Sequence, residues 1–547
     1  MKSVARGLFL AVLLCVEFVL FRGFVAREIA PQPPRNHDQS VYLREAYRIY
    51  RQASDEGVGT ALSAAVARSG PTGLLYPIEG ASLCLVAGPS RASALSVNFL
   101  VFALLQVAVF TALVSTSDRP SFACFGLGLV LLARSPFFWA GGLTDFRIDL
   151  VACGLYGVFL AAVLRSRVFT SRAWSIVAGL SAAVCILNRY LTIAYFAGLA
   201  VAFLSGVVIL AWSRDGRTRW PRSRVLSVLL AAGSALLVSG PVLWTQRRAI
   251  WQYYVIGHFG GDGATRARAV GIGAGLFYYP RSIVFDHPGP AVLLAILAAA
   301  AGVFVFARGS PPAGSGDRNF FREGVVFLSA AFAVPFILLA RDPDKSPVVG
   351  SILVPPLLLL SLWLLADRSG FLPGQSAGGG SDRFWTMGGP GLFAVGFLVF
   401  VSRLTWAHPG PDPGRQEVIR LHDVATDFVR REGWKLGVVS SDRIDDAFDA
   451  NTLTVYSFER EGLLRNFETG LPAGIHAVEP NIAYDVVRRS RFVLLTESET
   501  RSGGLPYDRS MRPLAVGLSS VCREAFVPLG TFQLPERTAV LWARRGP

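Results

Sequence analysis

Long apolar segments dominate this sequence, and they restrict what the chain can fold into. A membrane-spanning helix needs about 20 predominantly apolar residues, and about eleven stretches of the chain meet that requirement. Of the 547 residues, 52% are hydrophobic and only 17% are charged, a balance typical of multi-span membrane proteins. The predicted spans centre near Leu14, Leu105, Leu129, Tyr156, Leu180, Ala202, Ala232, Leu297, Phe332, Leu359 and Val395.

Two of these segments differ from the others. The stretch around Leu180 is short and ends at Asn188-Arg189, so it is either a partial span or one half of a helix pair. The first segment has the basic start of a signal peptide, with Lys2 and Arg6. Its apolar run is long, however, and no Ala-x-Ala cleavage site follows it, so we expect an uncleaved first helix.

Arginines in short loops indicate the orientation of the chain. The turn at 165–172 and the loop at 213–224 are rich in arginine, and basic short loops mark the cytoplasmic side. Both lie on the side of the N-terminus. An odd number of spans then places Asp38, the 246–289 loop and the C-terminal segment outside. We expect a multi-pass protein of a bacterial inner or plasma membrane with a cytoplasmic N-terminus.

The net charge of +15 comes almost entirely from arginines that are spread over the membrane loops. It therefore does not indicate binding to nucleic acid. The six cysteines lie mostly in apolar segments and show no zinc-type spacing. We expect neither a metal site nor a cofactor.

A change in composition divides the chain near residue 408. The Pro/Gly-rich run 408–414 is a predicted linker. It separates a membrane domain, residues 1–407 with outer loops at 26–90 and 246–289, from a small extracytoplasmic α/β domain at 415–547.

Periodicity within this last domain predicts a helix at 418–431 and strands at 435–440, 491–496 and 538–543. It contains neither a Gly-rich phosphate loop nor a nucleophile elbow. Acceptor binding and a structural role both stay open for it.

Three acidic residues lie near the predicted outer boundary of the membrane: Asp38, Asp145 and Asp149. Asp38 follows the first span, whereas Asp145 and Asp149 precede the fourth span and would share one helix face. Ionisable groups at membrane depth are costly and usually mark function. The alternative is that a carboxylate stabilises the N-terminus of a helix, which suits the position of Asp149.

Basic residues in the outer loops predict a phosphate site. The 246–289 loop carries five arginines against two aspartates, and guanidinium groups pair well with phosphate oxygens. Arg247, Arg248 and Arg281 are the candidates that flank its ends. Contact with lipid headgroups is the alternative.

Several motifs at the ends of spans occur in a characteristic order. In chain order they are His37-Asp38-Gln39-x-x-Tyr42-Leu43, an amphipathic helix over 42–51, Gly70-Pro71 to Tyr76-Pro77, the acidic motif 143–149, Asn188-Arg189-Tyr190, Phe277-Tyr278-Tyr279-Pro280-Arg281, and Asp344-Lys345-Ser346-Pro347. This order resembles the GT-C glycosyltransferases, in particular the branch of the protein O-mannosyltransferases and the aminoarabinose lipid A transferase. The resemblance covers roughly residues 1–365. One departure is that Gln39 follows Asp38, where the family often has a second acid.

The resemblance implies a polyprenyl-phosphate sugar as donor, a lipid, polysaccharide or protein as acceptor, and inverting transfer on the extracytoplasmic face. It implies Asp38 as the general base that deprotonates the acceptor, with Asp149 and Asp145 as further catalytic candidates. The candidate substrate-binding residues are His37, Gln39, Tyr42, Arg189, Arg247, Arg248, Tyr279, Arg281 and Lys345.

Two other functions compete with transfer. A lipid or sugar transporter or flippase would show inverted repeats and charges at mid-membrane, and no repeat is visible. A non-catalytic scaffold of GT-C type is the remaining alternative.

Overall fold

The computed structural model describes residues 2–34, 36–138, 140–212, 222–257, 272–306, 315–342, 345–369, 379–405, 413–444, 448–472, 477–500 and 506–545. The chain forms two compact units. The membrane unit contains residues 1–21, 65–76 and 97–406, and the C-terminal unit contains residues 22–64, 77–96 and 407–547. The predicted domain limits stay predictions, and most of the predicted linker lies outside the described residues.

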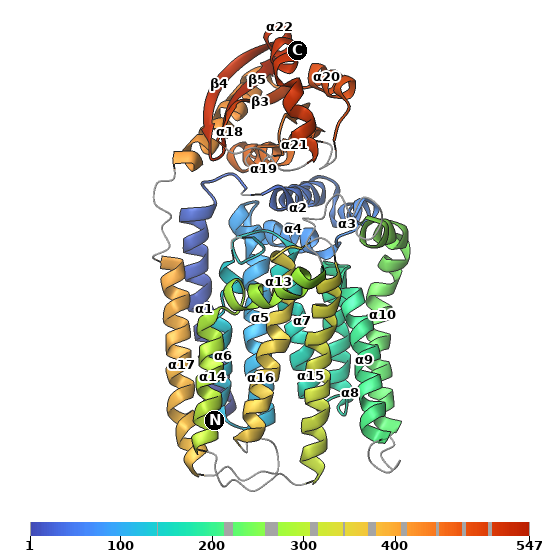
Figure 1. Cartoon of the computed structure of the whole chain (residues 1–547), viewed down its shortest axis with the longest axis vertical. Coiled ribbons are helices and arrows are strands. Elements are labelled where there is room, and N and C mark those ends of the chain that lie inside the picture. The colour runs from blue at the N-terminus through green and yellow to red at the C-terminus, as the bar shows by residue number, and fades with distance from the viewer. Residues whose placement is uncertain are drawn as a thin grey trace. The chain divides into compact units, whose positions relative to one another are not determined.

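A bundle of apolar helices builds the membrane unit (Figure 1). Every one of the predicted span centres lies in a helix, which confirms the predicted class of a mainly α-helical, multi-span membrane protein. The helices that contain these centres are α1 (Lys2–Phe24), α5 (Arg91–Ser117), α6 (Pro120–Leu132), α7 (Ile148–Arg165), α8 (Arg172–Asn188), α9 (Thr192–Trp212), α10 (Arg222–Trp251), α14 (Pro290–Phe306), α15 (Ser315–Arg341), α16 (Val354–Arg368) and α17 (Gly379–Thr405).

Not all of these helices are long enough to cross a membrane on their own. Within the described residues, eight helices are long and apolar enough to cross a membrane, or nine if one bent pair counts as a single span. That pair joins Leu276–Phe285 to Gly289–Val305 at an angle of 84°. Helix α8 is shorter and ends at Asn188, as the sequence predicts. The predicted total of eleven spans stays a prediction.

Part of the predicted outer loop 246–289 is helical. It contains the end of α10, the π-helix η3 (Gln252–Ile256) and helix α13 (Ile272–Phe285), the first half of the bent pair. Residues 258–271 of this loop lie outside the described residues.

Helix α7 is the most enclosed element of the bundle, since every residue from Ile148 to Leu164 is buried. Small residues let its neighbours approach. A Cβ atom on Gly154 would lie 2.6 Å from Val101, and one on Gly157 would lie 2.4 Å from Leu105. Membrane helices associate through such close packing because lipid offers no hydrophobic driving force between them.

Helices α6 and α17 pack along each other through glycines. A Cβ on Gly389 would lie 2.0 Å from the carbonyl oxygen of Ser121, and one on Gly396 would lie 2.5 Å from that of Gly128. Backbone atoms cannot move aside as flexible side chains can, so these two positions require glycine. Gly388 and Gly391, on the same helix, face open space.

We therefore expect Gly389→Ala to destabilise the membrane unit by about 1–3 kcal/mol, because the added methyl group forces α17 away from α6. The matched control Gly388→Ala should leave the melting temperature unchanged or slightly higher, since alanine favours helix. Thermal unfolding of the purified protein in detergent measures both. Equal melting temperatures for the two variants would contradict the proposed packing.

The C-terminal unit contains a five-stranded sheet with the order β2-β1-β3-β5-β4. Strands β1, β2 and β3 are parallel, and β5 pairs antiparallel with both β3 and β4. The predicted strands correspond to β1, β3 and β5, and the predicted helix corresponds to α18. The strands are β1 (Leu436–Ser441), β2 (Asn466–Leu471), β3 (Phe492–Glu499), β4 (Phe526–Leu534) and β5 (Arg537–Arg544).

Helices cover both faces of this sheet. Side chains alternate along a strand, so Phe492 and Leu494 of β3 enter one core while Val493 and Leu495 enter the other. The first core is closed by α18 (Pro413–Glu432) and α19 (Ala450–Glu461), and the second by α20 (Pro480–Arg489), α21 (Pro506–Met511) and α22 (Ala515–Ala525). A strand buried on both faces reads as a continuous apolar run, as residues 492–495 do.

Most of the first outer loop, residues 22–64 and 77–96, also belongs to the C-terminal unit. It forms α2 (His37–Glu56), α3 (Val58–Arg68) and much of α4 (Leu75–Ala87). Helix α2 includes the amphipathic helix predicted over 42–51. Its buried residues, among them Leu43, Ala46 and Tyr47, lie on one side, and the helix packs against α19.

Candidate functional site

Asp38 lies in the first turn of α2 and is exposed. The helix begins there because Asn36 caps it: the side-chain oxygen of Asn36 accepts a hydrogen bond from the backbone amide of Gln39 at 2.8 Å. A carboxylate in the first turn adds to this stabilisation. The local sequence thus fixes the backbone at Asp38, whose side chain is exposed.

The other candidates on α2 have different surroundings. The Nδ1 atom of His37 lies 2.6 Å from Oδ2 of Asp449. Gln39 is buried and Tyr42 is half-buried. Of the candidates in this segment, Asp38 and His37 therefore have the most accessible side chains.

A cluster of charged side chains in the membrane unit contains Asp145 and Asp149. Asp149 is buried in the first turn of α7 and forms an ion pair with Arg189, which ends α8. The Nε atom of Arg147 lies 3.8 Å from Oδ2 of Asp149 and 4.0 Å from Oδ2 of Asp145. The predicted candidates Asp145, Asp149 and Arg189 are thus brought together.

Asn98 holds the turn that carries these acids. Its Nδ2 atom donates to the carbonyl oxygens of Gly142, Leu143 and Asp145 at 3.2, 3.3 and 2.8 Å. The hydroxyl of Tyr76 donates to Asn98 Oδ1 at 2.7 Å. Sequence reasoning missed Asn98, although a lone asparagine within an apolar span is itself a signal of a polar role.

Glycine at position 141 brings a further segment to Asp149. Its φ of +76° suits glycine, and a Cβ there would lie 2.9 Å from Val348 and 3.0 Å from Cβ of Asp149. Val348 begins the 3-10 helix η4 (Val348–Leu353), which precedes α16. The backbone amide of Gly141 also donates to Oδ2 of Asp145 at 2.6 Å.

Lys345 precedes η4 in the chain, and Tyr279 of α13 lies against Gly350 within η4. The ammonium group of Lys345 donates to the carbonyl oxygens of Leu339, Ala340 and Asp342 at 2.9, 2.7 and 2.5 Å, and so caps the end of α15. Its Nζ atom lies 5.8 Å from the ring centre of the fully buried Tyr279. Lys345 therefore already has three acceptors in this structure.

His287 fixes the bend between α13 and α14, and it is not among the site residues predicted from the sequence. Its Nε2 atom lies 2.5 Å from the carbonyl oxygen of Pro347, just before η4. Its own carbonyl oxygen accepts from the amides of Arg134 and Ser135 at 2.7 and 2.9 Å. The bend, η4 and the turn of Asp149 are thereby held as one framework.

The remaining arginine candidates are exposed. Arg247 lies 4.3 Å over the ring of Trp244 and donates to the carbonyl oxygen of the same residue at 2.5 Å. No hydrogen bond or ion pair joins Arg248 or Arg281 to another residue in the described part of the chain. Of the predicted basic residues, these three can take a phosphate without giving up a buried partner.

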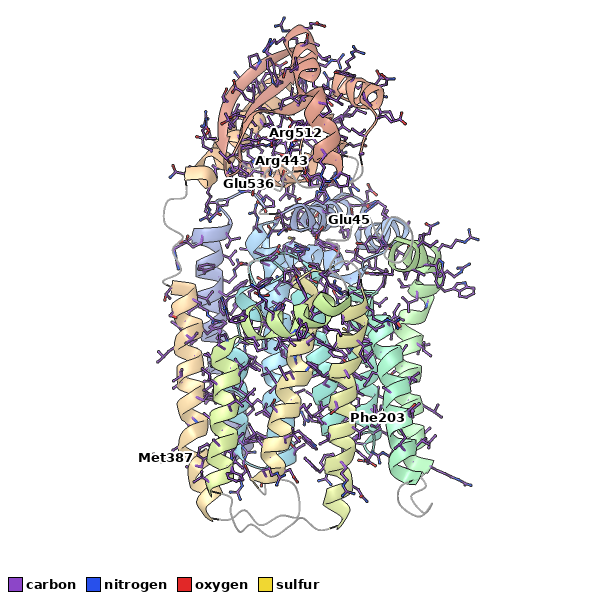
Figure 2. The ribbon with its side chains drawn as sticks, in the orientation of Figure 1. Glu45, Phe203, Met387, Arg443, Arg512 and Glu536 are labelled. Atoms are coloured by element: carbon purple, nitrogen blue, oxygen red, sulfur yellow. The ribbon has the colours of Figure 1, made fainter. Side chains whose placement is uncertain are left out.

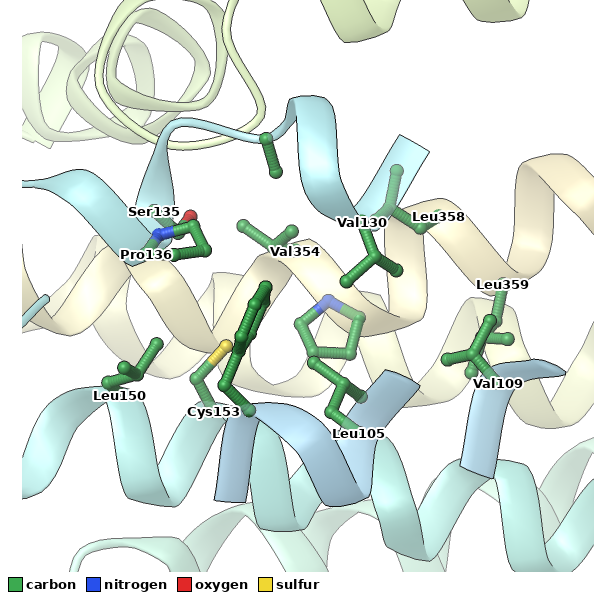
Figure 3. Close-up of a pocket in the computed structure, with 13 residues that line it drawn as sticks. Leu105, Val109, Val130, Ser135, Pro136, Leu150, Cys153, Val354, Leu358 and Leu359 are labelled. Carbon is green, nitrogen blue, oxygen red and sulfur yellow. The ribbon is translucent and has the colours of Figure 1, made fainter. Parts of the chain in front are cut away.

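An apolar pocket lies within the bundle (Figure 3). Cys153, Leu150 and Val354 line it together with Ser135 and Pro136 at one end. The hydroxyl of Ser135 is buried and has no hydrogen-bond partner among the described residues. With so little polar chemistry in its lining, the pocket suits hydrocarbon and offers no group for sugar transfer.

The carboxyl ends of β1 and β3 are the place where open α/β sheets usually bind ligands. In this protein a buried ion pair occupies them: Arg537 Nη1 donates to Asp442 Oδ1 at 2.8 Å. Arg443 and Glu536 form a second pair beside it (Figure 2). These side chains bind one another, which is consistent with a structural role for this part of the sheet.

No group of three or more His, Cys, Asp or Glu side chains within the described ranges could hold a metal ion. Asp38 with His37, Gln39 and Tyr42 belongs to the C-terminal unit, whereas the acidic cluster and the basic candidates belong to the membrane unit.

Comparison with solved structures identifies the fold. ArnT from Cupriavidus metallidurans in the apo state matches with a TM-score of 0.60 and 14% identity over 98% of either chain. The chain has the ArnT fold. ArnT bound to undecaprenyl phosphate matches with a TM-score of 0.59 and 13% identity, over 97% of this chain and 98% of its own. The resemblance to the GT-C glycosyltransferases is thus confirmed for the fold.

An oligosaccharyltransferase from Archaeoglobus fulgidus, in complex with zinc and sulfate, matches with a TM-score of 0.45 and 12% identity over 97% of this chain and 73% of its own. No protein-family model and no curated protein matches the sequence.

The ion pair between Asp149 and Arg189 gives a prediction. Replacing Arg189 with Met leaves the buried carboxylate with only the longer contact to Arg147, so we expect a loss of about 3–5 kcal/mol in stability. The double variant Asp149→Asn with Arg189→Met removes both charges and should recover much of that loss. Thermal unfolding in detergent of wild type, both single variants and the double variant measures how strongly the two side chains are coupled.

The matched control is Arg51→Met, which removes the arginine from the half-exposed pair with Asp55 on α2. Such pairs contribute little, so this variant should melt close to wild type. A double variant at Asp149 and Arg189 that loses the sum of both single losses would show that the two side chains are not coupled.

Proposed function

We propose that the protein is a membrane glycosyltransferase that moves a sugar from a polyprenyl-phosphate donor to an acceptor. The observation that carries the proposal is the match of the fold to ArnT over almost the whole length of both chains. One of the matched ArnT structures holds undecaprenyl phosphate. A fold by itself hosts several activities, so the chemistry of the individual residues has to support the proposal.

Asp38 has the properties that a general base requires. Its carboxylate is exposed, and the capped first turn of α2 fixes its backbone. In the proposed reaction it takes the proton of the acceptor hydroxyl or amine as that group attacks the anomeric carbon. The bond from the anomeric carbon to the phosphate oxygen breaks, its electron pair leaves with the lipid phosphate, and the configuration inverts.

The departing lipid phosphate needs positive charge near it. Arg189 and Lys345 already have buried partners, Asp149 for the former and three carbonyl oxygens for the latter. Binding a phosphate through either would break those contacts. We therefore favour the exposed Arg247, Arg248 and Arg281 as the phosphate-binding residues, with Arg189, Asp145 and Asp149 fixing the local structure.

The side of the membrane on which transfer takes place follows from the orientation that the arginine-rich short loops predict. With the N-terminus in the cytoplasm of a bacterial cell, Asp38 lies on the extracytoplasmic face of the inner membrane. The acceptor is then a lipid, polysaccharide or protein of the cell envelope.

The direct test is a transfer assay. Purified wild-type protein and Asp38→Asn are incubated with a panel of radiolabelled polyprenyl-phosphate sugars and a membrane extract as the acceptor. We expect Asp38→Asn to lower the rate by about 10²–10⁴-fold, the usual contribution of a general base. Its melting temperature should stay near wild type, because Asp38 is exposed.

Asp55→Asn is the matched control, because Asp55 is an exposed acid on the same helix. This variant should transfer at the wild-type rate. Transfer that does not depend on Asp38 would remove it as the base. Complete absence of transfer from well-folded wild-type protein would favour transport or scaffolding instead.

A second prediction concerns the donor phosphate. Arg281→Ala should raise the KM for the polyprenyl-phosphate donor by about tenfold, because an Arg–phosphate hydrogen bond contributes about 1.5–3 kcal/mol. Folding should be unaffected, since Arg281 is exposed. Arg368→Ala, at an exposed position that ends α16, is the control. An unchanged KM for Arg281→Ala would exclude this residue from the phosphate site.

A further inference from the structure

Helix α19 of the α/β domain contacts the first outer loop through its acidic side chains. Glu459 accepts hydrogen bonds from the hydroxyl of Tyr47 at 2.6 Å and from Nε of Arg91 at 3.1 Å, and its other oxygen pairs with Nη2 of Arg91. Tyr47 is fully buried, and its ring lies 4.7 Å from that of Phe458. One carboxylate thus joins α2 and the start of α5 to α19.

Arg91 extends this connection to the chain that leads into α2. Its Nη1 atom donates to the carbonyl oxygens of Ile29 and Gln32 at 3.2 and 2.5 Å. The guanidinium is almost completely buried, so every one of these partners offsets the cost of removing the charge from water. The segment before Asp38 is therefore held by a cation that α19 neutralises.

Asp449 forms the second connection, at the start of α19. It caps that helix: Oδ1 accepts from the amide of Thr452 at 2.7 Å, while Oδ2 faces Nδ1 of His37 at 2.6 Å. A carboxylate only accepts, so His37 donates this hydrogen bond. Burial raises the pKa of Asp449, but the hydrogen bond and charge of His37 and the bonds from Thr452 outweigh it and lower that pKa below its usual value.

These contacts lie on one face of α2. His37, Arg44 and Tyr47 are spaced so that their side chains fall within about 80° of one another at 100° per residue. Arg44 donates to Oδ1 of Asn451 at 2.8 Å, which adds a third contact with α19. Asp38 is the next residue after His37, about 100° further round the helix, and it is exposed.

We propose that α19 is a positioning element for the transferase base: Asp449 and Glu459 lock α2 so that Asp38 points in one fixed direction. The α/β domain is then part of the catalytic machinery rather than an appended domain. This inference rests on the proposed function in that it takes Asp38 as the base. Asp449 and Glu459 are positioning residues and touch no reactant.

The test compares full-length wild type with Asp449→Ser. Serine is a good helix cap, so α19 keeps its start, but its short side chain no longer reaches His37. Asp427→Ser is the matched control, because Asp427 is an exposed acid of the same domain that pairs with Arg430 on its own helix. Hydrogen exchange over residues 37–47 and steady-state transfer kinetics are measured on all three proteins.

We expect Asp449→Ser to raise exchange in the first turns of α2 by about tenfold and to lower kcat by about 10²-fold, since misplacing a catalytic group by about 1 Å has that effect. The KM values for donor and acceptor should change little, because no binding contact is removed. Asp427→Ser should match wild type in every measurement.

A double-variant cycle separates positioning from a direct role of His37. If His37 acts through Asp449, then His37→Ala combined with Asp449→Ser should lower kcat no further than either change alone. Additive losses in kcat would overturn the coupling. Unchanged exchange in α2, or raised exchange with wild-type kcat, would overturn the inference as well.

Failure of the proposed function gives a different result. If wild-type protein transfers no label, the glycosyltransferase proposal fails. The hydrogen-exchange measurement alone then tests whether α19 locks α2. Loss of protection in Asp449→Ser then supports the locking of α2 by α19, whereas retained protection overturns it.

Discussion

The absence of water inside a membrane is the constraint on which this structure depends. Backbone groups that cannot reach water must pair within their own segment, so the apolar stretches become helices. The same holds for polar side chains within the bundle. The hydroxyl of Tyr156 donates to the carbonyl oxygen of Ala331 at 2.9 Å, and Gln106 donates to the buried Glu17 at 2.7 Å. Each pair joins helices that are distant in the sequence.

The same constraint explains the candidate site in the membrane unit. Charges gather where helices end, and there they are neutralised by one another or by backbone carbonyls. Arg189 pairs with Asp149, and Lys345 binds the free carbonyls at the end of α15. Such groups build a rigid framework, with Asn98 and His287 holding its turns. Asp38 and the arginines at 247, 248 and 281 are exposed instead, which is why the proposed function assigns them to the substrate.

The C-terminal unit follows soluble-protein rules, yet it includes most of the first outer loop. Its two cores come from a sheet covered on both faces, which requires nothing from the rest of the chain. The contacts of α19 with α2 add polar ones, through Glu459, Asp449 and Asn451, to the packing of Phe458 on Tyr47. Because polar contacts depend on geometry more than on area, they give this interface directionality. That is the property needed to aim a side chain on α2.

The sequence by itself determined the elements whose signal is local. All predicted span centres are helical, because a long apolar run has no other stable form in lipid. The predicted strands are the three central ones of the sheet. The clearest signal among them comes from β3, whose residues 492–495 are buried on both faces and continuously apolar. The edge strands β2 and β4 were missed, since polar residues, glycine and a bulge interrupt their patterns.

Only the tertiary structure decided which charged groups meet. His37 and Asp449 are 412 positions apart, as are Tyr47 and Glu459, and no periodicity links such residues. The sequence marked Arg189, Lys345 and Asp149 as candidates by their type and by their place at the ends of spans. It could not show that Arg189 and Asp149 bind each other or that Lys345 caps a helix. Pairing energies depend on distance and burial, and both are set by the fold rather than by the order of residues.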